Sequence, residues 1–171
     1  MIILINLVAG NAEETDKLAY NIIVASLSLA QDGIPAALAA YDDQGVILST
    51  AALAGQALIV RALEIVKEIV TKENATKALQ PPDVGRLRAN IRRLINTEGP
   101  ASVLRDLLQI ELKSLSQNAR FNPCTAALNE VMIKTNQQST VLIISNRNHD
   151  AGALAFDLYN LSRKGKALIS V

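Results

Sequence analysis

The chain has 171 residues, which suits one domain large enough to bury a core without disulfides or metal ions as staples. Seventeen basic side chains nearly balance sixteen acidic ones, so no global charge attracts nucleic acid or an anionic membrane. Cys124 is the only cysteine, which excludes an internal disulfide and a cysteine-based metal cluster. With no long apolar run in the sequence, these features predict a cytoplasmic segment that contacts neither nucleic acid nor membrane.

Half of the residues are apolar, but only two Phe and three Tyr supply aromatic rings. The core must therefore consist of Leu, Ile, Val and Ala, which suits buried parallel strands between helices. The first strand is predicted at Ile2–Val8, which is apolar except for Asn6 and too short for a helix. We expect this strand at the centre of the sheet, buried on both faces.

Two long helices are predicted in the first half of the chain. Asn11 and Glu14 have the spacing of an N-cap and its partner acid, and they predict a helix that runs to about Asp32. Helical spacing of apolar residues predicts a second helix over Leu53–Lys72. Its expected buried face comprises Ile59, Leu63, Val66 and Val70.

A β-hairpin is predicted between these helices. The apolar runs Ile34–Tyr41 and Val46–Ser49 flank an acidic turn that ends in Gly45. One strand of an otherwise parallel sheet is therefore antiparallel. We expect Asp42 and Asp43 to form an acidic hairpin tip in water. The alternative is a role as metal ligands or as a catalytic base.

The segment 73–122 is predicted to be a helical insertion, with helices over Gly85–Ile95 and Ser102–Leu115. Pro100 is well placed to begin the second helix. We expect the apolar side chains of both helices to pack against the rest of the domain, and the arginines to lie in solvent. An acidic partner or a phosphate backbone is the alternative role of the arginines. The apolar set is Leu87, Ile91, Leu94, Leu104, Leu107 and Leu108, and the arginines are Arg86, Arg88, Arg92 and Arg93.

The last elements complete the sheet. Thr125 is predicted to cap a helix over Ala126–Lys134, and strands are predicted at Thr140–Ser145 and Ala167–Val171 around a helix at His149–Arg163. This alternation predicts an α/β fold with a doubly wound, mostly parallel, Rossmann-like sheet, one antiparallel strand and helices on both faces. Because the chain begins and ends in predicted strands, we expect a single domain, 1–171, from a longer protein.

In such sheets, ligands bind at the carboxyl ends of the strands, near the point where the strand order reverses. Three loops are predicted there: Ala9-Gly10-Asn11, Asn122–Thr125 and Asn146–Asp150. No glycine-rich phosphate-binding motif occurs in any of them.

Two candidates near this end, His149 and Cys124, invite a catalytic interpretation. His149 and Asp150 lie together, but their position at a predicted helix start favours a capping role over a triad with Ser145. Cys124 has no histidine or basic neighbour in sequence to activate its thiol, so we expect it to be inert. The sequence therefore predicts no catalytic residue and no cofactor.

Several stretches together carry a family resemblance. They are Ile3–Gly10, the predicted helix to Asp32, Ala39-Ala40-Tyr41-Asp42-Asp43, Cys124-Thr125-Ala126-Ala127-Leu128, Val141–Asn146, and Leu161–Gly165 with the strand that follows it. Most of the chain apart from segment 73–122 thereby resembles a von Willebrand factor A domain, of the prokaryotic type associated with MoxR-type AAA+ ATPases.

The resemblance implies a remnant of the family's metal-ion-dependent adhesion site. The D-x-S-x-S motif of the family falls on Asn6, Val8 and Gly10, its threonine on Thr125 and its last aspartate on Asn146. Because Mg²⁺ prefers ligand sets that include carboxylates, this degenerate site is expected to bind no metal.

The resemblance therefore implies a non-catalytic module that binds a protein partner, such as a MoxR-type AAA+ ATPase. The first alternative is a nucleotide- or flavin-binding enzyme of flavodoxin-like architecture that uses the same strand ends. The second alternative is a structural subunit of a larger assembly.

Overall fold

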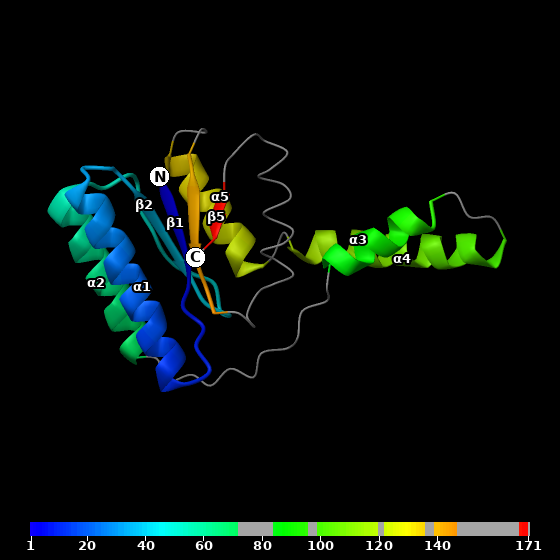
Figure 1. Cartoon of the computed structure of the whole chain (residues 1–171), viewed down its shortest axis with the longest axis horizontal. Helices are drawn as coiled ribbons and strands as arrows, with labels where there is room; N and C mark the ends of the chain where they lie inside the picture. Colours follow the sequence, from blue (N-terminus) through cyan, green and yellow to red (C-terminus); the bar gives the residue numbers. More distant parts are fainter. Residues whose placement is uncertain (72–83, 96–98, 120–121, 136–138, 147–167, 171) are drawn as a thin grey trace.

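The structure is a computed structural model that describes residues 1–71, 84–95, 99–119, 122–135, 139–146 and 168–170. Five strands form one sheet in the order β3-β2-β1-β4-β5. They are β1 (Ile2–Asn6), β2 (Ala37–Tyr41), β3 (Val46–Ser49), β4 (Val141–Ile144) and β5 (Leu168–Ser170). Strand β3 is antiparallel to β2, and the other pairs are parallel. The predicted mixed α/β sheet is thus confirmed, with β1 at its centre (Figure 1).

Strand β1 is central because it has a parallel neighbour along each edge. Ile2 lies opposite Ala37 of β2 and also opposite Val141 of β4. An apolar strand without polar alternation suits this position, since both faces are covered. The strand ends two residues earlier than Val8, because the N–H of Val8 donates to the Asn6 side chain instead of a strand.

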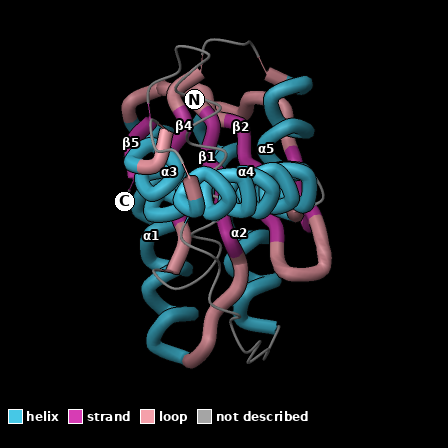
Figure 2. The backbone as a smooth tube through the Cα atoms, turned by 90° about the vertical axis from the view of Figure 1, so that its right-hand side faces the viewer, coloured by secondary structure: helices cyan, strands magenta, loops and turns pink. Residues whose placement is uncertain are grey.

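Helices cover both faces of the sheet, as predicted (Figures 1 and 2). The helices α1 (Ala12–Gln31) and α2 (Gly55–Thr71) pack on one face, against alternate β1 residues such as Ile3 and Ile5. The helix α5 (Pro123–Lys134) packs on the opposite face, in the same cluster as Ile2 and Leu4. The sheet is therefore the middle of three layers. No helix among the described residues is long and apolar enough to cross a membrane.

The buried face of α2 differs from the predicted one. Leu63 and Val70 are at least half exposed. The fully buried side chains of α2 are Leu58, Ala62, Ile65 and Ile69, and Val66 of the predicted face packs partly buried against the same core. Helix α2 carries its own apolar residues around most of its circumference, so their spacing is compatible with more than one buried face. The helix also begins at Gly55 and not at Leu53, because Leu53 forms a two-way backbone bridge with Ala36.

Helices α3 (Val84–Arg93) and α4 (Pro100–Ala119) pack on each other and extend away from the sheet (Figure 1). Leu87 and Ile91 are buried, whereas Leu104 and Leu107 are at least half exposed. The prediction that all six apolar side chains pack against the rest of the domain is therefore wrong. The physical reason is that α4 carries apolar residues on two sides, and one neighbouring helix covers one side. Pro100 begins α4, as predicted.

Two helix starts test the predicted caps. Asn11 caps α1, and its Oδ1 accepts a hydrogen bond from the N–H of Glu14 at 2.9 Å, as predicted. The cap predicted at Thr125 is wrong. Asn122 caps α5 and Pro123 occupies the first helical turn, where its missing N–H costs no hydrogen bond. The predicted helix His149–Arg163 lies outside the described residues.

The buried face of α2 can be tested with a matched pair of leucine truncations. Leu58→Ala is expected to lower the free energy of unfolding by about 3 kcal/mol, because it leaves a cavity in the core. Leu63→Ala is expected to lower it by less than about 1 kcal/mol. Urea denaturation of both variants measures the difference. Equal losses would contradict the observed orientation of α2.

Candidate functional site

The candidate site is the end of the sheet where the carboxyl ends of β1, β2 and β4 lie side by side. From β1 the chain crosses to β2 on one side, and it later returns to β4 on the other side. The order of the strands therefore reverses between β1 and β4, which is where sheets of this class bind ligands. We call this end the rim. It comprises the predicted site residues Asn6, Val8, Gly10, Thr125 and Asn146, with Ser145.

Asn6 ties the end of β1 to the end of β4. Its side chain is fully buried, at 0% exposure. Its Oδ1 accepts a hydrogen bond from the N–H of Val8 at 3.0 Å. Its Nδ2 donates to Oγ of Ser145 at 3.3 Å. Both ends of this amide are thus used within the protein, as a buried polar group requires.

Asn146 holds the same loop from the β4 side. Its Nδ2 donates to the backbone carbonyl of Val8 at 2.8 Å. The Ser145 hydroxyl, which accepts from Asn6, donates to the backbone carbonyl of Asn146 at 3.3 Å. The two asparagines therefore hold both backbone polar groups of Val8, and the predicted residues Asn6, Val8 and Asn146 form one hydrogen-bonded cluster.

Gly10 lies at the exposed edge of this cluster, where α1 begins. Its N–H donates to Oε2 of Glu14 at 2.7 Å, so a carboxylate from the first turn of α1 holds the loop. A Cβ atom added at Gly10 would lie 3.3 Å from that oxygen. A serine there would therefore require the Glu14 carboxylate to shift by a few tenths of an ångström.

Thr125 lies in the first turn of α5. Because α5 leads back across the sheet to the start of β4, which is parallel to β1, this first turn is at the same end as the carboxyl ends of the strands. It is buried on the α5 face, the face to which strand alternation assigns Asn6 together with Ile2 and Leu4. The thiol of its neighbour Cys124 forms no disulfide within the chain and is fully buried. Such burial keeps reagents away from the thiol, which agrees with the inert role expected for it.

Asp42 corrects one prediction about the hairpin. It follows Tyr41 at the carboxyl end of β2. It is buried, whereas the sequence predicted a position in water. Its Oδ1 accepts from the N–H groups of Gln44 and Gly45 at 2.8 and 3.0 Å. The carboxylate thus builds the hairpin turn, a role that aspartate shortly before glycine in a turn could have indicated. Asp43 is exposed, as predicted.

The donor set of the rim does not fit a hard metal ion. Mg²⁺ needs several oxygen ligands, normally with carboxylates among them. Here Asn6 and Asn146 carry neutral amides, Oδ1 of Asn6 accepts from Val8, and Asn146 turns its N–H group to Val8. Within the described ranges, no three His, Cys, Asp or Glu side chains form a group that could hold a metal ion.

An acidic side chain near the rim, Glu13, forms an ion pair on the surface of α1. Glu13, one turn before Lys17, accepts a hydrogen bond from its ammonium group at 2.6 Å. This hydrogen bond, together with the positive charge of Lys17, lowers the pKa of the Glu13 carboxyl. A lowered pKa on an exposed carboxyl does not suit a general acid. His149 and Asp150, the predicted capping pair, lie outside the described residues.

The chain matches no protein-family model, no curated protein and no solved structure.

The link between β1 and β4 can be measured with a double-mutant cycle. Asn6→Ala is expected to lower the free energy of unfolding by about 2 kcal/mol, since it leaves buried polar groups without their partner. Ser145→Ala is expected to cost about 1 kcal/mol. The double variant should lose less than the sum of the two, by about 0.5–1 kcal/mol, because the single changes remove the same hydrogen bond. Additive losses in urea denaturation would contradict the hydrogen bond.

Proposed function

We propose that this chain is a non-catalytic protein-interaction module that resembles a von Willebrand factor A domain and contacts its partner at the rim without a metal ion. The observation that carries this proposal is the hydrogen-bonded cluster of Asn6, Val8, Ser145 and Asn146. At the positions that match metal ligands of the family, the amides hold the loop themselves.

A metal ion and a pair of amides are two ways to hold the loops of the rim together. In the family, the ion bridges the loops of the rim and the partner. An amide has both a donor and an acceptor, so Asn6 and Asn146 can hold the loops without a charge. The bridging of loops is thereby preserved, whereas the charge that would attract an acidic ligand is lost. We therefore expect a partner that recognises the shape and hydrogen-bonding groups of the rim.

The contact surface would comprise the exposed residues around the cluster. Gly10, Asn11, Ala12 and Glu13 are exposed at the start of α1. Their backbone is held by the Asn11 cap and by the Glu14 carboxylate, so little order would be lost on binding. The resemblance to MoxR-associated proteins makes a MoxR-type AAA+ ATPase the partner that we propose.

A pair of arginine substitutions on one helix tests the rim as the contact. Ala12→Arg places a long side chain at the rim, whereas Gln31→Arg places the same side chain at the other end of α1; both positions are exposed. In calorimetric titration with a MoxR-type ATPase, Ala12→Arg is expected to weaken binding by at least about tenfold. The Gln31→Arg variant should bind like the parent chain.

Three outcomes of that titration would contradict the proposal. The parent chain could fail to bind the ATPase, both variants could bind like the parent, or Gln31→Arg could weaken binding as much as Ala12→Arg does. Stabilisation of the parent chain by a nucleotide or by a flavin in thermal unfolding would instead favour the enzyme alternative.

Restoration of the family's ligands tests the metal-free character of the rim. The parent chain is expected to give no binding signal with millimolar Mg²⁺ or Mn²⁺ in calorimetry. The combined variant Asn6→Asp, Val8→Ser, Gly10→Ser and Asn146→Asp is expected to gain metal-dependent stability, by about 2.7 kcal/mol when free metal is about 100 times its Kd. Gly10→Ser meets no positive φ, so the shift of Glu14 is its main steric requirement.

The control for this variant is the same set of measurements with EDTA, which should return its unfolding temperature to the metal-free value. Binding of Mg²⁺ by the parent chain that EDTA reverses would show that the rim holds a metal site, and the proposed metal-free contact would be wrong.

A further inference from the structure

The balanced total charge of the chain hides an uneven distribution. Helix α3 contains four arginines and no acidic residue, whereas the two basic and two acidic residues of α4 cancel. Residues 1–71, which supply β1 to β3 and the helices α1 and α2, instead contain eight acidic and three basic residues. The expectation that no charge attracts nucleic acid holds for the total charge, but it does not describe α3.

The packing of α3 determines which of its sides faces outward. Leu87 and Ile91 are buried and Leu94 is partly buried, and their spacing puts them on the side that packs against α4. Helical spacing places Ala89, with Gly85 one turn before it, at the centre of the opposite side. Ala89 is exposed. The midline of the outward side therefore consists of small residues.

The arginines of α3 lie on both flanks of this midline. Arg88 and Arg92 are four positions apart and belong to one flank, whereas Arg93 belongs to the other. Arg92 and Arg93 are exposed, and Arg88 is partly buried. Arg86 precedes Arg93 by seven positions, which is the same side of a helix. The outward side of α3 thus has small residues between two rows of arginines.

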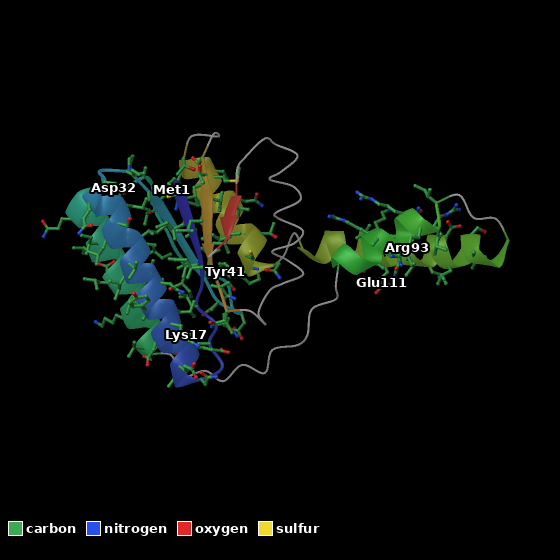
Figure 3. All side chains as sticks on the ribbon, viewed as in Figure 1. Met1, Lys17, Asp32, Tyr41, Arg93 and Glu111 are labelled. Atoms are coloured by element: carbon green, nitrogen blue, oxygen red, sulfur yellow. The ribbon has the colours of Figure 1, made fainter. Side chains whose placement is uncertain are left out.

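The position of the hairpin keeps this basic side apart from the acidic part of the chain. The hairpin of α3 and α4 extends away from the sheet, and Figure 3 shows Arg93 on it, well apart from Tyr41 at the end of β2. An extended polyanion can therefore approach the arginines without approaching the acidic residues of α1. Electrostatic attraction acts at this distance in dilute salt.

The chemistry of the outward side distinguishes between polyanions. A helix that lies in a membrane surface needs an apolar face in the lipid, but the apolar face of α3 is buried against α4. An acidic peptide gains most of its affinity from apolar anchors, and between the arginines it would meet only Gly85 and Ala89. Phosphate groups need no such anchors, because guanidinium groups bind their oxygens in a bidentate manner.

The arrangement of the two rows favours double-stranded DNA among nucleic acids. The major groove of B-form DNA is about 12 Å wide and admits an α-helix, with a phosphate backbone along each wall. Small residues at the midline let a helix approach the base pairs closely, and arginines on its flanks face the two backbones. The major groove of double-stranded RNA is too narrow for this arrangement.

We propose that α3 binds double-stranded DNA in the major groove, with Gly85 and Ala89 toward the base pairs and the arginines of its two flanks toward the two phosphate backbones. Because the charged groups contact phosphates, binding depends strongly on salt and little on base sequence. This surface is separate from the rim and does not depend on the function proposed there.

Fluorescence anisotropy with the full chain and a fluorescein-labelled DNA duplex of about two helical turns tests the proposal. Saturable binding is expected at about 50 mM salt, and the logarithm of the affinity should fall with the logarithm of the salt concentration with a slope of about −3 to −4. Arg92→Ala and Arg93→Ala, one on each flank, should each make this slope shallower by about one. Arg92→Lys keeps the charge and should retain the slope of the parent chain.

A matched pair of glutamate substitutions tests the location of the contact. Ala89→Glu puts a carboxylate between the two rows and is expected to weaken binding by at least about tenfold, because it repels the phosphates. Ala57→Glu on α2 changes the net charge equally at another exposed helical alanine, and it should bind DNA like the parent chain. Circular dichroism should show unchanged helix content in every variant.

Four results would overturn the proposal. The parent chain could show no saturable binding of the duplex, or Ala57→Glu could weaken binding as much as Ala89→Glu does. Tighter binding of an RNA duplex, or of poly-glutamate, than of the DNA duplex would assign the arginines to a different occupant.

Discussion

The position of β1 between two parallel strands is the constraint on which the rest of the structure depends. Both edges of β1 are hydrogen-bonded, to β2 and to β4, and both of its faces are covered by helices. A strand in this position has to be apolar along its length, because no side chain of it reaches water. Its neighbours are parallel, so the chain must cross the sheet by way of helices. These crossovers bring the carboxyl ends of β1, β2 and β4 to one end.

The rim follows from this arrangement. Asn6 is the one polar residue of β1, and it stands at the point where the strand ends. Burial of an amide there is favourable only if its donor and its acceptor both find partners. Val8 and Ser145 supply them, and Asn146 completes the cluster. A carboxylate at the same buried position would carry a charge that requires a cation or several donors. The neutral amide accounts for a rim that is held together without one.

Local physics allowed much of the fold to be predicted from the sequence alone. The central strand, the Asn11 cap, the hairpin that ends in Gly45 and the start of α4 at Pro100 depend on residues close together in the chain. Hydrogen bonds of caps and turns, and the continuous burial of a parallel strand, leave a signature within a few residues. The positions of Asn6, Val8 and Asn146 at one end of the sheet followed from the strand order.

The tertiary structure decided what depends on distant partners. The bonds of Asn6 to Ser145 and of Asn146 to Val8 join residues 139 and 138 positions apart, and no local pattern specifies them. The face that α2 buries was ambiguous, because apolar residues surround most of the helix and the packing of α1 and the sheet selects one side. Likewise, α4 carries apolar residues on two sides, and the position of α3 determines which side is covered and which remains available.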